Sequence, residues 1–366
     1  MKDLIFESIV IRGVNVPLNN PLVAHIGNFD KWPFLCIDVI TNHSIVGRSY
    51  IGPYLVDQLP SIAHCIKALS KKFVKRAIEP STFFDEGMKN ISLLGYKGIG
   101  LYALAALDIA FWDAHSKNAN QPLAQHLGGG LKPIKSYNSG GLWLIPLKEI
   151  SKEAAALRKE ADFTALKLRI GRETYKEDIA AFDAVKKGAG EDVLVLSDFN
   201  QCYTPKEAER RCKELDDTGF FWFEEPMKYD NYSELSLLKN SISTPITIGE
   251  NFHGPRDLHK ALESKACDMI MPDLMRIGGV TGWLRAAAIA ETYNMEFSTH
   301  LYPEVSSHLM TVTPNSEWCE YVDWANPIIK EPYQVKNGNI IIPEKVGTGI
   351  EWNEENMSRY SVNLNL

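Results

Sequence analysis

The chain has 366 residues, of which 45% are hydrophobic and 23% charged, and its formal net charge is −7 at pH 7. This length can bury a large core and suits two domains, or one barrel with an addition. The negative charge and the lack of a basic run argue against nucleic-acid and membrane-surface partners. No apolar stretch is long enough to span a bilayer. Residues 1–18 lack the pattern of a secretory leader, and the six cysteines form no CxxC pair, so we expect reduced thiols and a cytoplasmic protein.

The first third of the chain predicts a small α+β domain over residues 1–125. Strand-like runs cover Ile5–Val16, Phe34–Thr41 and Ser44–Tyr50, and Asn42-His43 suits a tight turn between the last two. Helical patterns follow. One helix face is marked by Leu104, Leu107, Phe111 and Ala114, before the breaker Gly128-Gly129-Gly130.

From about residue 134 the chain alternates between strands and helices. The candidate strands are Ile134–Tyr137, Ala165–Ile170, Val193–Ser197, Phe221–Phe223, Ile246–Ile248, Met269–Met271, Glu296–Ser298 and Trp318–Tyr321. Their number and spacing favour a parallel β/α barrel over residues 130–325, and ionisable residues close successive strands throughout the series. An open doubly wound sheet would gather them near one switch point. The tail, residues 326–366, is expected to return to the first domain and complete it.

Three acidic residues end consecutive strands of this barrel. Asp198, Glu224 and Glu250 would meet at the barrel mouth, where C-terminal strand ends converge. Three hard oxygen donors with water completing the shell suit Mg²⁺. Glu225 should point into the wall, because neighbouring residues of a strand face opposite ways.

A candidate base and two cations end other strands. Asp273 and His300 close neighbouring strands, so the carboxylate can fix the imidazole tautomer and raise its basicity. Lys167 and Arg169 share one strand face and can both aim into the mouth. One of them could neutralise a substrate carboxylate, and the other would lie across the substrate from His300.

Three further residues complete the expected site. Glu320 ends the last strand, and a dry site near other carboxylates would raise its pKa and keep it protonated. It could then donate to a developing enolate oxygen. Ser139 and Asn200 are neutral donors that could hold the substrate. Together these roles predict metal-assisted removal of the proton next to a carboxylate, through an enediolate, in a small-molecule substrate.

At this point the chain resembles the enolase superfamily and, within it, the mandelate racemase subgroup. The resemblance spans nearly the whole chain. Its motifs are Leu166-Lys167-Leu168-Arg169, Asp198-Phe199-Asn200-Gln201, Phe223-Glu224-Glu225-Pro226, Gly249-Glu250-Asn251, Met271-Pro272-Asp273 through Trp283, and Ser298-Thr299-His300-Leu301. It implies a capping domain over a modified (β/α)7β barrel, Mg²⁺ dependence and often a homo-octamer. The two capping loops that close such sites would map to about residues 18–32 and 50–56.

One departure from the subgroup bears on the reaction. The racemase has a second lysine where this chain has Arg169, so racemisation would lack a competent base on one face. Dehydration of an acid sugar needs one good base and is favoured. Racemisation or epimerisation of a 2-hydroxy acid is the alternative, and a non-catalytic binding barrel is a third hypothesis. The first capping loop mixes polar residues such as His25 and Asp30 with apolar ones, which suits a hydroxylated substrate better than a phenyl ring.

Overall fold

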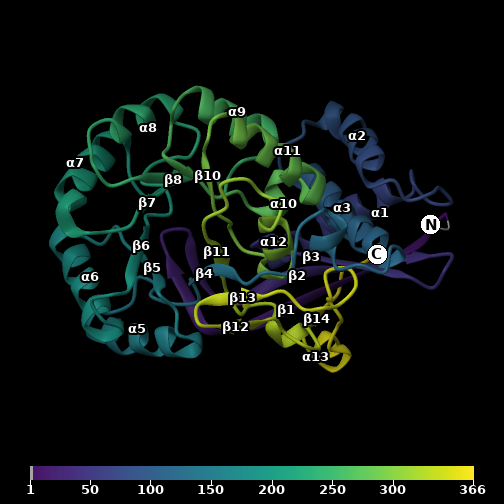
Figure 1. The fold of residues 1–366 in the computed structure, drawn as a ribbon, viewed down its shortest axis with the longest axis horizontal. Helices are drawn as coiled ribbons and strands as arrows, with labels where there is room; N and C mark the ends of the chain where they lie inside the picture. Colours follow the sequence, from purple (N-terminus) through teal and green to yellow (C-terminus); the bar gives the residue numbers. More distant parts are fainter. Residues whose placement is uncertain (1–2) are drawn as a thin grey trace.

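The structure, a computed structural model, describes residues 3–366, so the expected domain start at residues 1–2 lies outside the described residues. Figure 1 shows a ring of strands surrounded by helices on one side and a smaller layer of strands and helices on the other. Within residues 3–366 the strands form a four-stranded sheet in the smaller layer and a ten-stranded sheet that contains the ring. No helix in the described part of the chain has the length and apolarity needed to cross a bilayer.

The smaller layer is the α+β capping domain. Its strands β1 (Phe6–Ala24), β2 (Gly27–Thr41) and β3 (Val46–Ile51) are antiparallel neighbours. The first two were expected to stop near residue 16 and to resume near residue 34. They instead continue through residues 18–32 as one long hairpin, with a register shift between Pro17 and Leu22. The expected first capping loop is therefore an ordered hairpin, because its backbone pairs across the two strands.

Helices cover one face of the capping sheet. They are α1 (Leu59–Ser70), α2 (Pro80–Ile91), α3 (Ile99–Asn118) and the short α4 (Leu123–His126). The expected core positions of α3, from Leu104 to Ala114, are buried, and the helix also packs on a barrel helix, α11 (Gly279–Thr292). β3 approaches α3 closely, since a Cβ on Gly47 would lie 2.1 Å from the carbonyl oxygen of Ala110. Only glycine fits this contact.

The expected barrel is present, and all of its strands fall where the alternation predicted them. They are β4 (Ile134–Asn138), β5 (Ala165–Arg169), β6 (Leu194–Asp198), β7 (Phe223–Glu224), β8 (Ile246–Ile248), β9 (Met269–Ile270), β10 (Glu296–Phe297) and β11 (Cys319–Tyr321). Neighbouring strands from β4 to β10 pair in parallel, and β11 pairs in parallel with β4. Backbone hydrogen bonds from Thr299 to Trp318 and from Glu317 to Phe297 close the ring between β10 and β11.

Helices form the outer layer of the barrel in Figure 1. They are α5 (Leu147–Ala161), α6 (Tyr175–Ala189), α7 (Pro205–Leu215), α8 (Tyr232–Lys239), α9 (Pro255–Glu263), α10 (Leu274–Ile277), α11 and α12 (Pro303–Met310). The N-terminus of α6 is fixed by a capping box in which Thr174 and Glu177 exchange hydrogen bonds. All six cysteines are free thiols, as expected.

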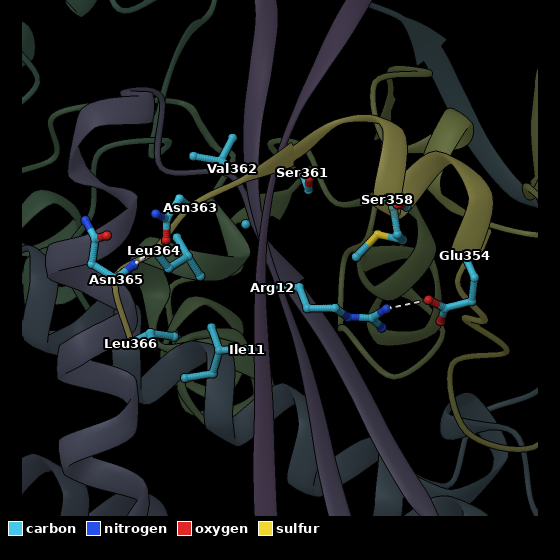
Figure 2. Close-up of a pocket in the computed structure, with 12 residues that line it drawn as sticks. Ile11, Arg12, Glu354, Ser358, Ser361, Val362, Asn363, Leu364, Asn365 and Leu366 are labelled. Carbon is cyan, nitrogen blue, oxygen red and sulfur yellow. Dashed lines mark hydrogen bonds and ion pairs between the residues drawn. The ribbon is translucent and has the colours of Figure 1, made fainter.

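The C-terminal tail is divided between the two sheets. The hairpin of β12 (Gln334–Lys336) and β13 (Asn339–Ile341) pairs with β4 and extends the barrel sheet. After α13 (Glu354–Arg359), β14 (Ser361–Val362) pairs with β1 of the cap. Figure 2 shows this last segment lying along the capping sheet, where Arg12 pairs with Glu354 at 2.6 Å. The tail therefore ties the cap to the barrel.

Buried polar contacts join the cap to the barrel. Asp108 of α3 accepts hydrogen bonds from the backbone and side chain of Thr281 on α11, at 2.8 and 2.6 Å. Glu304 of α12 accepts a hydrogen bond from the hydroxyl of Tyr50 on β3. Burial raises the pKa of Glu304 to about 7.

Replacing Glu304 with glutamine should flatten the pH dependence of stability. Between the ordinary glutamate pKa of 4.5 and the folded value of about 7, the folded state binds more protons than the unfolded state. The wild type should therefore lose stability as the pH rises through this window, while Glu304→Gln should not lose that part. The loss of free energy of unfolding of the wild type between pH 5 and pH 8 that Glu304→Gln avoids, measured by urea denaturation, should be roughly 2–3 kcal/mol.

Glu355→Gln, at an exposed position of α13, should keep the wild-type pH dependence of stability. An unchanged slope in Glu304→Gln would contradict this assignment.

Candidate active site

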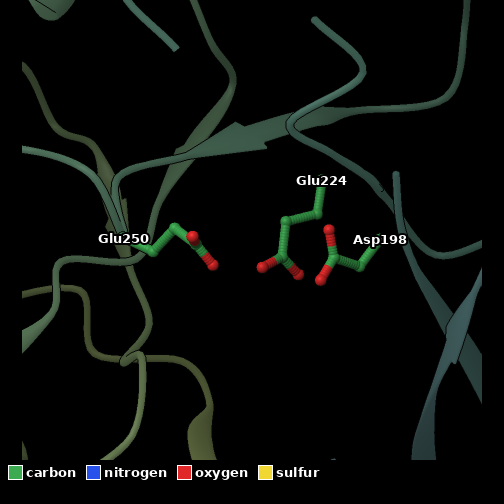
Figure 3. Close-up of side chains that lie close together, drawn as sticks. All are labelled: Asp198, Glu224 and Glu250. Atoms are coloured by element: carbon green, nitrogen blue, oxygen red, sulfur yellow. The ribbon is translucent and has the colours of Figure 1, made fainter. Parts of the chain in front are cut away.

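Three carboxylates converge at the barrel mouth, as the strand ends predicted. Asp198 ends β6, Glu224 ends β7, and Glu250 lies two residues beyond β8. One ligand oxygen from each lies within 4.8 Å of the others. Figure 3 shows the carboxylates of Asp198 and Glu224 side by side, with that of Glu250 pointing toward them from the opposite side.

The donor set fits a divalent cation. Burial and then repulsion from Asp198 raise the pKa of Glu224, so the nearby ammonium of Lys167 neutralises the carboxylates only in part. The Oε2 atom of Glu224 is buried without a hydrogen-bond partner. Hard oxygen donors with spare lone pairs are those that Mg²⁺ prefers. Glu225 lies outside this group, as expected, and accepts a hydrogen bond from Asn251 at 2.8 Å.

Lys167 supplies a buried positive charge beside the carboxylates. Its Nζ lies 2.6 Å from Glu320 and 3.2 Å from Glu224, and the side chain is 1% exposed. Burial alone would lower the pKa of Lys167, but the attraction of these two carboxylates outweighs it and raises the pKa. The ammonium is therefore a fixed cation.

The expectation of a protonated Glu320 is wrong in this structure. Burial would raise its pKa, but the nearby charges of Lys167 and His300 lower it below its usual value. The carboxylate accepts from Lys167 and also from the backbone N–H of Leu301, at 2.8 Å. Glu320 therefore holds Lys167 in place, and it also lines the cavity.

His300 and Asp273 form the expected pair. They face each other across a bridge between the segments after β9 and β10, and Nδ1 of His300 lies 2.8 Å from Oδ2 of Asp273. The other ring nitrogen, Nε2, lies 3.3 Å from Glu250 and so faces the carboxylate group. Burial alone would lower the pKa of His300, but Glu250, Glu320 and Asp273 together raise it. The imidazole is oriented and made more basic.

Arg169 lies at the mouth beside Lys167, but its guanidinium is fixed by hydrogen bonds and by stacking. Its Nη2 donates to the Ser139 hydroxyl at 2.9 Å, and its Nη1 donates to the carbonyl oxygens of Ser139 and Gly141 at 3.3 and 3.5 Å. Its face stacks on Trp143 with 3.9 Å to the ring centroid, and Nε is 3.7 Å from Asp198. Ser139, expected to bind substrate, accepts this hydrogen bond and so orients Arg169.

Asn200 also serves a metal-site residue. Its backbone N–H and side-chain amide donate to Asp198 at 2.7 and 2.8 Å. It lines the cavity, as a substrate-binding residue should, but its hydrogen bonds fix the orientation of that carboxylate. Such outer hydrogen bonds determine how a metal ligand is aimed.

Arg276 and Tyr54 were missed from the sequence. Nη1 of Arg276 donates to the backbone of Glu250 at 3.0 Å and to Asn251 at 2.8 Å, and its guanidinium stacks on Tyr54 at 4.7 Å. The spacing of Arg276 from Asp273 could have indicated the position of Arg276. Asp273 caps α10, so a residue three positions later turns back toward the same strand end. Tyr54 could not be aimed without the structure, because it lies in an irregular segment with φ at 64°.

The capping hairpin closes the site. The cavity between the hairpin and the barrel mouth is small, with a volume of about 30 Å³. Tyr54 comes from the second capping loop and also lines it. The hairpin is bonded to the barrel rim by Asn19 to Asp323 (2.6 Å), Asn20 to Gly140 (2.9 Å), Leu144 to Val23 (2.9 Å) and His25 to Gly171 (3.0 Å).

The hairpin presents its apolar side to the cavity, contrary to the interpretation of its polar residues as substrate contacts. Leu22, Ala24 and Ile26 line the cavity, whereas His25 is turned to the rim. The reason is the alternation of side chains along a strand, which places every second residue on the same face.

Comparison with known families agrees with this geometry. A family model described as the mandelate racemase / muconate lactonizing enzyme N-terminal domain matches residues 7–128, and one described as enolase C-terminal domain-like matches residues 149–356. The chain belongs to this family. The expected resemblance to the enolase superfamily and the expected fold are thus confirmed.

Solved relatives of this enolase-superfamily chain cover almost its whole length. An enolase from alphaproteobacterium BAL199 with bound magnesium is 40% identical, has a TM-score of 0.96, and covers 98% of this chain and 100% of its own. An enolase from Bradyrhizobium complexed with magnesium and mandelic acid is 32% identical, has a TM-score of 0.94, and covers 99% of this chain and 100% of its own.

Curated relatives of the enzyme carry out several reactions. The L-talarate/galactarate dehydratase of Salmonella typhimurium is 28% identical over 72% of this chain and 66% of its own length. The L-Ala-D/L-Glu epimerase of Clostridium acetobutylicum is 27% identical over 95% of this chain and 99% of its own. Lyases and epimerases are thus both similar to this protein.

Addition of Mg²⁺ should stabilise the enzyme through the three carboxylates. At a hundredfold excess over Kd, binding adds about 2.7 kcal/mol and should raise the thermal midpoint by roughly 3 °C. Glu250→Gln should lose most of this shift. Glu317→Gln, which removes a carboxylate paired with Lys135 on the same barrel, should keep it. An equal shift in all three proteins, measured by calorimetry, would place the ion elsewhere.

His300→Asn should abolish turnover and α-proton exchange while leaving the Mg²⁺-induced thermal shift intact, because His300 is the predicted base and is not among the three candidate metal ligands. Asp273→Asn should lower kcat by about 10²–10⁴-fold with a smaller change in KM, since the imidazole loses the acceptor that fixes its tautomer. Deuterium exchange in D₂O measures both effects. Wild-type exchange in His300→Asn would remove the assigned base.

Proposed function

We propose that this enzyme dehydrates a 2,3-dihydroxy carboxylate, with Mg²⁺ as its cofactor and His300 as its single base. The observation that carries the proposal is the asymmetry of the site. The paired imidazole of His300 faces the carboxylate group from one side. The corresponding position on the β5 side is occupied by Arg169, and an arginine is normally a poor base.

The residues of the chain divide the work between them. Asp198, Glu224 and Glu250 would hold Mg²⁺, which, when bound, withdraws charge from a substrate carboxylate and acidifies the adjacent C–H. Lys167 and Arg169 provide fixed positive charge for the same carboxylate. The raised pKa of Lys167 keeps its ammonium charged while a proton is transferred elsewhere.

His300 performs both proton transfers in this proposal. Its Nε2 takes the proton from carbon 2, and the C–H electron pair moves into the forming double bond. The imidazolium then returns that proton to the hydroxyl on carbon 3, whose C–O bond breaks to release water. The enol that remains tautomerises to a 2-keto-3-deoxy acid, so the balance is substrate to keto acid plus water.

The curated relatives support this reaction class. They include dehydratases for talarate, galactarate and arabinonate. Racemisation or epimerisation is the second candidate, favoured by the 32% identical structure that holds mandelic acid, a ligand without a carbon-3 hydroxyl. The non-catalytic barrel gains no support, because the expected metal and base residues converge. A cytoplasmic location and a homo-octamer stay predictions.

Product analysis in D₂O separates the two reactions. With a 2,3-dihydroxy carboxylate and Mg²⁺, the wild type should form a 2-keto-3-deoxy acid, detected as its semicarbazone, and the recovered substrate should keep its configuration. Arg169→Lys supplies a neutralisable amine at the second position and should begin to return inverted, deuterated substrate. Arg169→Met, which has no titratable group, should not. Inverted substrate from the wild type would overturn single-base dehydration.

A further inference from the structure

The cavity above the charged floor has an apolar ceiling. The floor consists of the charged or titratable lining residues, which are Lys167, Arg169, Asp198, Glu250, His300 and Glu320. The ceiling comes from the capping hairpin and the barrel rim, and the residues that form most of it are Leu22, Ala24, Ile26, Trp32, Trp143 and Trp324. Charged side chains of the barrel mouth and apolar side chains of the hairpin and rim thus line the same small space.

The aromatic part of this ceiling is packed in advance. The Trp32 ring lies 4.4 Å from that of Trp324 and 4.9 Å from that of Tyr54, and Trp143 lies 6.3 Å from Trp324. Trp32 is 1% exposed and Trp324 6%. Rings that are already fixed by one another lose little freedom when they contact a ligand.

Few neutral hydrogen-bonding side chains line the cavity. Among the described lining residues they are Tyr54 and Asn200, apart from the indole N–H groups, and the hydrogen bonds of Asn200 go to Asp198. A ligand hydroxyl that is buried without a hydrogen-bond partner weakens binding of the ligand by roughly tenfold or more. An extended polyhydroxy chain would bury several. A second carboxylate would find no lysine or arginine of its own in the lining, because Lys167 and Arg169 are both assigned to the reacting carboxylate.

We infer that the substrate is a 2,3-dihydroxy carboxylate whose carbon 3 carries a short apolar group, alkyl or aryl, rather than a further polyhydroxy chain. The carboxylate lies over the floor and the apolar group under Trp32 and Trp324. The carbon-3 hydroxyl in this inference rests on the proposed dehydration. The preference for an apolar group rests only on the residues of the ceiling.

The experiment compares two series of acids with the Mg²⁺-loaded enzyme. Dehydration is followed with the stereoisomers of 2,3-dihydroxybutanoate and 2,3-dihydroxy-3-phenylpropanoate, and with pentonates and hexarates. Exchange of the α-proton in D₂O is followed with 2-hydroxybutanoate and mandelate, which have no hydroxyl to lose from carbon 3. The apolar dihydroxy acids should have kcat/KM at least about a hundredfold above the polyhydroxy acids, from two or more unpaired hydroxyls.

The two series distinguish failure of the inference from failure of the reaction. Dehydration of pentonates or hexarates with no activity on the apolar acids would overturn the inference and leave dehydration standing. Exchange of the apolar monohydroxy acids without elimination from any dihydroxy acid would support the ceiling's preference and overturn dehydration. If the apolar acids undergo neither exchange nor elimination, the inference is overturned.

A hairpin variant tests the ceiling directly. Ile26 lines the cavity but is 48% exposed, so Ile26→Asn should fold and should lower the preference for apolar acids by roughly tenfold, mainly through KM. Val10→Asn is the matched control, because Val10 is 45% exposed on β1 and far along the strand from the cavity-lining residues. An unchanged preference in Ile26→Asn would remove the hairpin from substrate selection.

Discussion

The site depends on holding like charges together in a buried place. Carboxylates that lie within 4.8 Å of one another repel, and burial strengthens the repulsion by removing water. The barrel meets this cost with closed backbone pairing, which fixes the strand ends on which the charges are mounted. Lys167 offsets part of the repulsion from within the mouth. The repulsion that is not offset corresponds to a negative potential that attracts a divalent ion. The repulsion that destabilises the site without metal and the affinity for the metal therefore have the same origin.

The parts of the site that follow from strand geometry could be predicted from the sequence. Residues at the carboxyl ends of parallel strands share one edge, which suffices to bring Asp198, Glu224 and His300 together. Alternation along a strand placed Lys167 and Arg169 on one face. The fold could be predicted for the same reason, since the barrel repeats one local pattern. These inferences need only periodicity and the order of the elements.

What could not be predicted depends on partners that are distant in sequence. The charge state of Glu320 is set by Lys167, more than 100 residues away, at a distance that no local pattern gives. Ser139 and Trp143 surround Arg169 because the loop after β4 folds back over β5. The facing of the hairpin required its register, which shifts near Pro17. A shift of this kind reverses which side chains look inward, so composition alone indicated the wrong face.

Trp143 connects the reaction to the choice of substrate. One face of its ring supports the Arg169 guanidinium, and the same side chain lines the ceiling where the substituent would lie. A planar cation stacks on an indole better than an ammonium does, so the aromatic wall favours arginine over lysine at this position. Arginine in turn removes the second base. The apolar wall and the single-base chemistry are therefore coupled through the contact of Trp143 with Arg169. A change in the wall should alter which residue is favoured at position 169, and a change at position 169 should alter which residue is favoured in the wall.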